Sequence, residues 1–347
     1  MQQPLVSILV PMRNEEDFIE SCLASLRAQD YPADRLEILV LDGASTDRSG
    51  EIVTAIARED PRVRLLPNPK RLQAAAMNLG TQHAAGEIIV RADAHAVYGP
   101  SYVSTCVGHL LAGRAENVGG LQRAEGTTYF GRALAAALNS RFGSGNAAYR
   151  VATEERYVDT VWLGAWKRQT LLDLGGFDES MAANEDYELN CRLRKQGGRI
   201  LLDPSLPSRY FPRATLGRLW RQYFRYGQAK VRTLQLHPGS LVLRQLIPPL
   251  FVALVIMSLI ALPWTYLPLL AITALYALAL IAGSVAAIAK AGGSLFPLLP
   301  PIYATIHFAW GLGFWWGMLR YRGFPLAGKS VKSSTLPSKT PPDKSGG

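Results

Sequence analysis

Two aspartates follow directly after segments that predict buried strands, because these segments are short and rich in branched apolar residues. Asp42 follows the predicted strand 36–41, and Asp93 follows 87–92. Ligands of an open parallel sheet bind beyond the carboxyl ends of its strands, so both carboxylates are expected in one crevice. There they can accept hydrogen bonds from a base or a ribose, or hold a metal ion. An aspartate after a strand can also cap the next helix, and that alternative stays open for each.

His95 lies two residues after Asp93, so in an extended loop the two side chains can converge on one divalent cation. Such a cation neutralises the charge that develops on a departing nucleotide diphosphate, and an imidazole ligand favours Mn²⁺ over Mg²⁺. A second acidic pair, Glu185 and Asp186, begins the predicted helix 184–196. One of these acids can remove the proton of an acceptor hydroxyl as a general base. Both can equally satisfy the positive end of a helix dipole.

The elements that must position these residues alternate along the first hundred positions. Short apolar strands are predicted at 5–10, 36–41, 63–66 and 87–92, with helical segments between them. This alternation predicts βαβ units and a mostly parallel, Rossmann-like sheet flanked by helices, which is an α/β fold. A dehydrogenase would share the pattern, but no G-x-G-x-x-G motif follows the first strand.

The last third of the chain has the composition of a membrane region. No Asp, Glu, Lys or Arg occurs from Gln245 to Ala289, and a second such stretch runs from Ala291 to Leu319. A helical span needs about 20 apolar residues, so about three membrane segments are predicted, at 246–263, 266–288 and 297–319. Buried helices of a soluble protein are a poor alternative, because two such stretches leave nothing polar for a surface.

The charge pattern predicts the domain organisation and the compartment. The net charge is +10, and many basic residues lie just before the first apolar stretch, which marks the cytoplasmic side of a membrane and disfavours nucleic acid as the partner. We expect a cytoplasmic domain at 1–213, an amphipathic interfacial helix and linker at 214–240, a membrane region at 241–321 and a disordered tail at 322–347. The N-terminus lacks a signal peptide and the three cysteines show no paired spacing, both of which fit a cytoplasmic domain.

The predicted protein is therefore a multi-pass protein of the inner (plasma) membrane. The side of the C-terminus stays open at this point. Three spans would place it outside, whereas the basic residues of the tail favour the inside; these are Arg320, Arg322, Lys329, Lys332, Lys339 and Lys344.

Six motifs follow one another in order between residues 5 and 230. They are VSILVPMRNEE at 6–16, LVLDGASTD at 39–47, NLG at 78–80, DAH at 93–95, GGFDE at 175–179 and EDYELNCRL at 185–193. This ordered set resembles the family 2 glycosyltransferases, which have the GT-A fold. Residues 91–95 and 145–150 further resemble the bacterial exopolysaccharide glucosyltransferases of the succinoglycan type, which also carry C-terminal membrane helices.

The resemblance implies a nucleotide pocket at the carboxyl ends of the first strands. By this resemblance, Pro11, Glu15 and Asp42 line the site of the base and ribose, and Arg71 approaches the base or the phosphates. The expected donor is a nucleotide-diphosphate sugar, most of all a UDP-sugar.

The resemblance also implies roles for the acidic residues. Asp93 and His95 occupy the place of the D-x-D motif that holds a divalent metal, Mn²⁺ or Mg²⁺, although the final Asp is His here. Asp186 matches the catalytic base of the Glu185-Asp186 pair. Arg225 lies in a stretch, QYFRY at 222–226, that resembles the Q-x-x-R-W motif of processive synthases and can contact the diphosphate. Tyr in place of Trp favours single additions.

The implied function is inverting transfer of a hexose, with glucose favoured, from the donor to a lipid-linked saccharide in exopolysaccharide or cell-envelope glycan synthesis. A processive polysaccharide synthase and a polyprenyl-phosphate sugar transferase are alternatives within the family. A catalytically silent, nucleotide-binding membrane scaffold is the alternative of another class. Sequence alone names neither the sugar, the linkage nor the acceptor.

Overall fold

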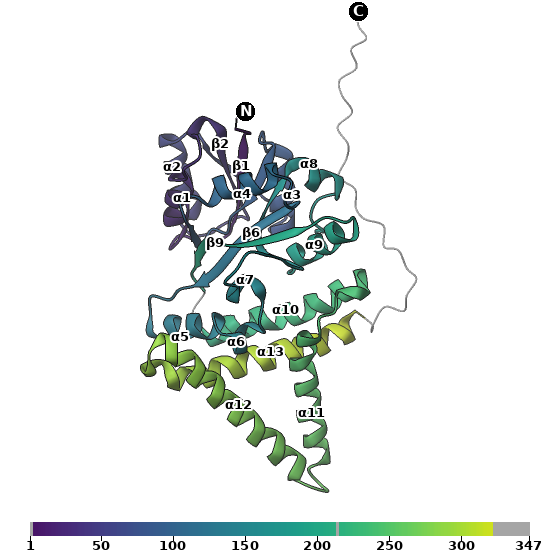
Figure 1. Cartoon of the computed structure of the whole chain (residues 1–347). Coiled ribbons are helices and arrows are strands. Elements are labelled where there is room, and N and C mark those ends of the chain that lie inside the picture. The colour runs from purple at the N-terminus through teal and green to yellow at the C-terminus, as the bar shows by residue number, and fades with distance from the viewer. Residues whose placement is uncertain (1–2, 213–214, 322–347) are drawn as a thin grey trace, which may run out of the picture.

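The structure is a computed structural model that describes residues 3–212 and 215–321, apart from the side chain of Lys290. The tail predicted at 322–347 lies outside the described residues. A folded α/β unit with a large sheet is joined to a layer of long helices, two of which project away from it (Figure 1).

The sheet is parallel on one side and mixed on the other. The four strands predicted from the first hundred residues pair in parallel in the order β3-β2-β1-β4, and the antiparallel β8 then continues the sheet toward β6, β9 and β5. Strand β9 pairs in parallel with β6 and antiparallel with β5 and β7. The strands are β1 (Val6–Met12), β2 (Leu36–Asp42), β3 (Val63–Pro67), β4 (Ile88–Arg91), β5 (Ala96–Tyr98), β6 (Asn117–Ala124), β7 (Arg156–Tyr157), β8 (Trp162–Lys167) and β9 (Ile200–Tyr210).

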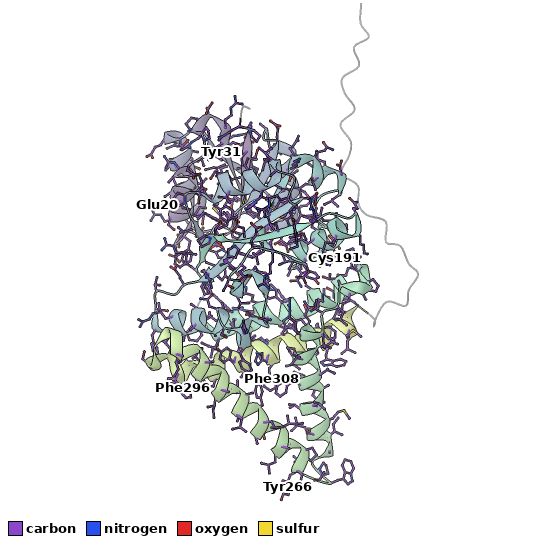
Figure 2. All side chains as sticks on the ribbon, in the orientation of Figure 1. Glu20, Tyr31, Cys191, Tyr266, Phe296 and Phe308 are labelled. Carbon is purple, nitrogen blue, oxygen red and sulfur yellow. The ribbon has the colours of Figure 1, made fainter. Side chains whose placement is uncertain are left out.

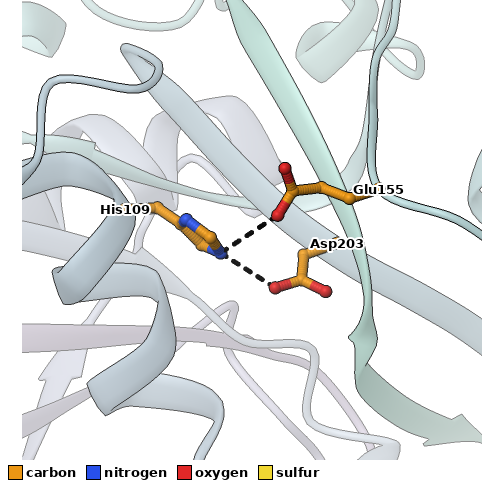
Figure 3. A group of neighbouring side chains, drawn as sticks. All are labelled: His109, Glu155 and Asp203. Atoms are coloured by element: carbon orange, nitrogen blue, oxygen red, sulfur yellow. Dashed lines mark hydrogen bonds and ion pairs between the residues drawn. The ribbon is translucent and has the colours of Figure 1, made fainter.

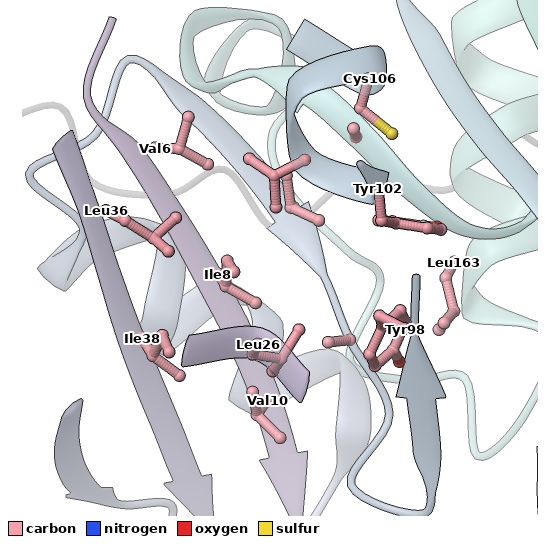
Figure 4. Packing of buried hydrophobic residues seen from close by; sticks show 14 of the residues in the cluster. Val6, Ile8, Val10, Leu26, Leu36, Ile38, Tyr98, Tyr102, Cys106 and Leu163 are labelled. Carbon is pink, nitrogen blue, oxygen red and sulfur yellow. The ribbon is translucent and has the colours of Figure 1, made fainter. Parts of the chain in front are cut away.

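Helices cover both faces of the sheet, and side chains of β1 enter a core on each face. Val6, Ile8 and Val10 point into one core, and Leu9 points into the other, because successive side chains of a strand alternate between faces. Figure 4 shows the first core, with these β1 residues beside Leu36 and Ile38 of β2. The helices are α1 (Ile19–Arg27), α2 (Ser49–Glu59) and α4 (Tyr102–Leu111) on that side, and α3 (Gln73–His83), α8 (Arg168–Asp173) and α9 (Glu185–Lys195) on the other, with a 3₁₀ turn η1 at Ala33–Arg35.

Three short helices follow β6 in the chain. They are α5 (Tyr129–Leu138), α6 (Arg141–Ser144) and α7 (Ala148–Val151). Apolar residues of α5, such as Leu134 and Leu138, share a third core with Leu299 and Tyr303 of the last long helix. The Tyr303 hydroxyl lies 3.0 Å from Ser140 Oγ, beside this core. The α5–α6 segment therefore fixes the membrane helices to the sheet domain.

The C-terminal part begins with the predicted amphipathic helix, α10 (Leu216–Leu236), and continues with long apolar helices. These are α11 (Ile247–Ala261), α12 (Leu267–Ala291) and α13 (Leu299–Arg320), joined by the 3₁₀ turns η2 (Pro238–Ser240), η3 (Leu243–Leu246) and η4 (Gly293–Leu298). Among the described residues, three helical stretches are long and apolar enough to cross a membrane, as predicted: Leu243–Ala261, Leu267–Ala289 and Gly293–Arg320. Figure 2 places Tyr266 at the far tip of the α11–α12 hairpin.

Candidate active site

A cavity of about 1850 Å³ opens at the carboxyl ends of β1, β2 and β4. Pro11 and Met12 line it from β1, Leu41 from β2 and Arg91 from β4. Its walls continue past the start of α9 to α10 and then to the membrane helices, where Phe251, Tyr276 and Trp310 are lining residues. The cavity therefore joins the strand ends predicted to bind a nucleotide with the membrane region.

Arg91 gathers the acidic residues of the cavity. It is the last residue of β4 and is buried, with its guanidinium group between three carboxylates. Nη1 lies 3.2 Å from Glu185 Oε1 and also contacts Asp186 Oδ1, and Nη2 lies 3.4 Å from Asp93 Oδ1. Since a buried guanidinium requires anionic partners, this contact fixes the start of α9 against the end of β4. Asp93, Glu185 and Asp186 were predicted from the sequence, but their assembly around Arg91 was not.

Asp186 has the electrostatic environment of a base that works near neutral pH. Burial raises the pKa of its carboxyl group to about 7, and the nearby charges of Glu185 and Asp93 act in the same direction, while Arg91 opposes them. Asp186 also lines the cavity. A carboxylate with such a pKa can take a proton from a substrate hydroxyl at physiological pH.

Helix α9 is held in place by contacts at its start and along its side. Asn184, at the N-cap, has a left-handed backbone (φ 62°) and its Nδ2 donates to the Tyr226 carbonyl of α10 at 3.4 Å. Glu188, buried one turn later, accepts from Arg192 Nε at 2.8 Å and from His237 Nε2 at 2.9 Å. Arg192 in turn donates to the carbonyl of Gly176 at 2.7 Å. These bonds orient the turn that carries Asp186.

Lys230 of α10 is a further buried residue beside this turn. Its ammonium group donates to the Ser240 carbonyl at 2.8 Å and lies 4.3 Å from the ring centroid of Tyr187, the residue after Asp186. Burial lowers the pKa of Lys230 to about 8. The sequence placed Lys230 only in a basic amphipathic helix, and no local pattern marked it as buried.

The nucleotide end of the cavity is built by the loops after β1 and β2, which bind each other. Asn14 has a left-handed backbone (φ 54°). Its side-chain Oδ1 accepts from the backbone amide of Thr46 at 2.8 Å, and its own backbone amide donates to Ser45 Oγ at 2.9 Å. Asp42 Oδ1 accepts from the Ser45 amide at 3.0 Å and from Ser45 Oγ at 2.6 Å. Asp42 therefore stabilises the turn beside the cavity.

The remaining residues predicted for the nucleotide lie in the cavity wall. Pro11, Glu15 and Arg71 are lining residues, and Glu15 is buried. Arg71 has a left-handed backbone (φ 57°) and precedes Leu72, the N-cap of α3. Asp42 differs from them, since it lies between the lining residues Leu41 and Gly43.

Asp93 and His95, the residues predicted to hold a metal, both line the cavity. Asp93 Oδ1 accepts from Gln73 Nε2 at 3.2 Å, besides its contact with Arg91. His95 Nδ1 lies 3.3 Å from Glu15 Oε1, and its ring packs against Tyr210 with the centroids 5.2 Å apart. One carboxylate and one imidazole on the same loop, with a second carboxylate beside the imidazole, are donors that fit a divalent cation.

A second group of potential metal ligands lies in the sheet domain, away from the residues that line the cavity. His109, Glu155 and Asp203 place their ligand atoms within 4.8 Å of one another (Figure 3). His109 Nε2 lies 2.8 Å from Asp203 Oδ2, and Arg114 Nη1 lies 3.0 Å from His109 Nδ1. Because a guanidinium only donates, Nδ1 is the acceptor and Nε2 carries the proton toward Asp203. In this arrangement the group is a hydrogen-bonded network, which Arg114 completes through its ion pair with Glu155.

Basic residues line the cavity between the sheet domain and the membrane helices. Arg225, predicted to approach the diphosphate, is an exposed lining residue on α10. Further arginines line the same section, from α6, α10 and the turn before α11; they are Arg141, Arg218, Arg221 and Arg244. This section suits an anionic group such as a phosphate.

Known proteins resemble this chain in sequence and in fold. The sequence profile described as Glycosyl transferase family 2 matches residues 7–155. Succinoglycan biosynthesis protein ExoA of Rhizobium meliloti (strain 1021) is 32% identical over 317 residues, which are 91% of this chain and 95% of that protein.

Two further proteins that resemble this chain have names that describe the transfer of different sugars. A dolichyl N-acetyl-alpha-D-glucosaminyl phosphate 3-beta-D-2,3-diacetamido-2,3-dideoxy-beta-D-glucuronosyltransferase of Methanococcus voltae is 25% identical over 91% of this chain and 97% of its own length. The solved structure of a mannosyltransferase from Pyrobaculum calidifontis, in complex with GDP-Man and Mn²⁺, superposes with a TM-score of 0.60 at 22% identity, over 91% of this chain and 88% of that one. Likeness at this identity shows the fold, and it confirms the architecture predicted from the sequence.

Proposed function

This chain belongs to family 2 of the glycosyltransferases, enzymes of polysaccharide and glycan biosynthesis, and from that premise we propose that it is an inverting hexosyltransferase that acts on a lipid-linked acceptor. The donor in this proposal is a nucleotide-diphosphate sugar, with UDP-glucose the first to test. The acceptor is a saccharide on a lipid carrier, in exopolysaccharide or cell-envelope glycan synthesis.

One observation carries the proposal: a single cavity contains the strand ends of the sheet, Asp186 and residues of the membrane helices. A soluble acceptor needs no passage toward the bilayer. A lipid-linked acceptor does, because its reacting sugar must reach Asp186 while its chain stays in the membrane. In this account residues 1–213 are the cytoplasmic catalytic domain, 214–240 the interfacial linker and 241–321 the region in the inner membrane.

At the donor end, Pro11, Glu15 and Arg71 contact the nucleoside, and Asp42 holds the loop that borders it. Asp93 and His95 hold a divalent cation, Mn²⁺ or Mg²⁺. When bound, this cation neutralises charge on the departing diphosphate. Mn²⁺ in the mannosyltransferase from Pyrobaculum calidifontis gives this assignment its precedent, and the imidazole of His95 favours Mn²⁺.

The transfer step is a direct displacement. Asp186 takes the proton of the acceptor hydroxyl as its oxygen bonds to the anomeric carbon, and the bond to the nucleotide diphosphate breaks. The proton ends on Asp186, the electron pair leaves with the diphosphate, and the anomeric configuration is inverted. Arg91 holds Asp186 and Glu185 against Asp93, so that the base and the donor end keep a fixed relation.

Arg225 contacts the diphosphate of the donor. At the acceptor end, the neighbouring arginines bind the phosphate groups of the carrier; they are Arg141, Arg218, Arg221 and Arg244. Arginine suits this task because its planar guanidinium donates two parallel hydrogen bonds to a phosphate. The lipid chain then passes between the membrane helices at Phe251 and Tyr276.

The proposal is tested by nucleotide release from a panel of nucleotide sugars, with purified protein in detergent and a lipid extract of the source membrane. Metal-dependent turnover of one donor that rises with the lipid extract, with inverted product configuration, is the expected result. A product with the donor's own configuration would contradict the single displacement. Turnover with water-soluble sugars alone would contradict the lipid-linked acceptor, and inactivity with every donor would favour a silent scaffold.

A further inference from the structure

Helices α10 and α13 lie side by side and run in the same direction (Figure 1). Their backbones meet at glycines: a Cβ on Gly313 would stand 2.1 Å from the Phe224 carbonyl oxygen, and one on Gly227 would stand 2.2 Å from that of Trp310. At the C-terminal ends of both helices, Gln235 Nε2 donates to the Tyr321 carbonyl at 2.8 Å. The two helices therefore share one orientation relative to any membrane.

Helix α10 cannot lie within the hydrocarbon of a bilayer. Its 21 residues include five basic side chains and no acidic one, and it also carries Gln222, Gln228 and Gln235. Charged side chains are costly at the bilayer centre. One side of α10 is moreover bound to the catalytic domain, where Lys230 contacts Tyr187, and where His237, which follows the helix, binds Glu188. α10 thus lies at or above the membrane surface.

Helix α13 must share that location, although its composition alone fits a span. Of an 18-residue apolar segment in Gly293–Arg320, the stretch that contains α13, 39% is buried inside the protein, compared with 6% in Leu267–Ala289 and 17% in Leu243–Ala261. α13 also contacts the start of α11, where Trp315 Nε1 donates to the Pro249 carbonyl at 2.8 Å. Its exposed residues include Trp315 and Trp316, and tryptophan is enriched at the level of lipid headgroups.

Helices α11 and α12, by contrast, leave this layer and meet at a distant tip (Figures 1 and 2). The stretch Leu243–Ala261 has 19 residues and α12 has 25, so they extend about 28 Å and about 37 Å at 1.5 Å per residue. These lengths fit a hydrocarbon core of about 30 Å. At the tip, Trp264 is 81% and Tyr266 65% exposed, as expected for residues at the opposite interface.

We propose that the α11–α12 hairpin alone crosses the membrane, and that α13 lies beside α10 in the headgroup region of the leaflet that faces the catalytic domain. Two crossings place the C-terminus on the same side as the catalytic domain. Arg320 and the basic residues that follow it in sequence then lie on that side, in agreement with the positive-inside rule. Three crossings would place them on the other side.

Cysteine labelling tests the sidedness. The native Cys22, Cys106 and Cys191 are free and buried, so added cysteines dominate the signal. Glu20→Cys reports the catalytic domain, Thr265→Cys the hairpin tip and Ser333→Cys the C-terminal tail. In spheroplasts of an expressing bacterium, a membrane-impermeant maleimide is expected to label Thr265→Cys at once, and the other two only after permeabilisation.

Labelling at each position tests a different part of the proposal. Labelling of Ser333→Cys in intact spheroplasts would overturn the hairpin arrangement, and protection of Thr265→Cys there would overturn the crossing. Labelling of Glu20→Cys in intact spheroplasts would instead overturn the cytoplasmic placement that this inference takes from the proposed function. These labelling outcomes do not bear on whether the protein transfers a sugar, so the topology and the proposed function can fail separately.

A depth measurement tests the placement of α13 directly. Nitroxide labels at Thr305→Cys, Leu312→Cys and Leu319→Cys of α13 are expected at one shallow depth in lipid nanodiscs, from the relative accessibility of oxygen and a nickel chelate. Matched labels on α12, at Leu267→Cys, Leu275→Cys and Val285→Cys, are expected to be deepest at Leu275→Cys. A depth maximum at Leu312→Cys would show that α13 spans the membrane and would overturn the proposal.

Discussion

At the scale of single residues, Arg91 determines how the acids of the cavity behave. Its guanidinium contacts Asp93, in the loop after β4, and also Glu185 and Asp186, which begin α9 more than ninety positions later. The three carboxylates share one counter-charge, and burial keeps the pKa of Asp186 near 7. This arrangement leaves Asp186 able to exchange a proton, while Arg91 stays charged.

The pH dependence of turnover follows from Asp186. A base must be deprotonated to accept a proton, and burial raises the pKa of Asp186 to about 7. We therefore expect kcat/KM to be constant above that value and to fall about tenfold per pH unit below it. Initial rates between pH 5.5 and 9 at saturating metal measure this. A constant rate down to pH 5.5 would contradict a base with this pKa.

Replacing Arg91 removes the counter-charge. Arg91→Met leaves the buried carboxylates of Asp93 and Glu185 and the partly buried one of Asp186 without a cation, which we expect to destabilise the fold by about 3–5 kcal/mol. The acid limb of the pH profile should move to higher pH, because Arg91 is the group that lowers the pKa of Asp186. Thermal unfolding in detergent and the pH profile measure the two effects. Arg91→Lys, which keeps the charge, is the control, and equal behaviour of both variants would contradict the role of charge.

Sequence reasoning found the acids of the site but missed the residue that binds them. Asp93, Glu185 and Asp186 could be picked out because they follow a strand or begin a helix. Arg91 ends a strand, and nothing nearby in the sequence shows that its side chain meets a helix that starts at Glu185. Asp42 was expected in the same crevice as Asp93, whereas it lies between two lining residues, and its bonds to Ser45 depend on a turn geometry that spacing does not reveal.

At the scale of elements, helix α9 matters because it carries Asp186 and is fixed by a network of polar groups around the buried Glu188 and His237. Lys195 Nζ donates to His237 Nδ1 at 2.8 Å, so His237 Nε2 carries the proton that binds Glu188. This contact joins α9 to the end of α10. The orientation of the turn that carries Asp186 is therefore coupled to α10.

Loss of His237 should loosen this connection. His237→Ala leaves buried Glu188 with one partner fewer, and we expect a loss of about 1–3 kcal/mol in the free energy of unfolding. Turnover should fall without a change in donor affinity, because the nucleotide end is untouched. The exposed His83 offers a matched control, and His83→Ala should change stability by less than about 0.5 kcal/mol. Equal effects of the two substitutions would contradict the network.

The glycines between α10 and α13 provide a test of their packing. A Cβ on Gly313 would meet the Phe224 carbonyl oxygen, whereas one on Gly217, in the first turn of α10, meets nothing within 4 Å. We expect Gly313→Ala to cost about 1–3 kcal/mol through overpacking. Gly217→Ala should be neutral or slightly stabilising, since alanine favours helix. Thermal unfolding in detergent compares them, and a neutral Gly313→Ala would contradict the close approach.

The elements themselves were predictable where their pattern is local. β1 and β2 differ from their predicted ranges by a residue or two, because branched apolar runs mark buried strands well. The packing of α13 against the rest of the protein was harder to predict from the sequence. Hydropathy measures only how apolar a helix is, and three apolar stretches are present as predicted. Which protein surface covers α13 depends on glycines of both helices, and hydropathy does not detect such pairs.

At the scale of the whole molecule, one cavity connects the sheet domain with the membrane helices. The α5–α6 segment and α10 hold these two parts together, through the core that contains Leu134, Leu219 and Tyr303. Sequence reasoning placed the site beside a membrane. It could not show a continuous passage, because that depends on how α6, α10 and α11 pack around it.

Blocking the passage separates donor chemistry from acceptor entry. Ala279 of α12 lines the cavity, and Ala274, on the same helix, is exposed. We expect Ala279→Trp to raise the KM for a lipid-linked acceptor at least about tenfold, since a filled passage excludes a bulky chain. Slow hydrolysis of the donor by water should be unchanged. Ala274→Trp should behave as the wild type, and equal KM values in both variants would contradict this entry route.

The central claim is that Asp186 is the base for transfer to a lipid-linked acceptor, and Asp186→Asn tests it most directly. The measurement is sugar transfer to extracted membrane lipid, together with donor affinity, for this variant and for Asp173→Asn. Asp173 is an exposed aspartate on α8, away from the cavity lining, and serves as the control. We predict that Asp186→Asn lowers transfer by about 10² to 10⁴ with donor affinity kept, while Asp173→Asn is unaffected. Near-normal transfer by Asp186→Asn would contradict the account.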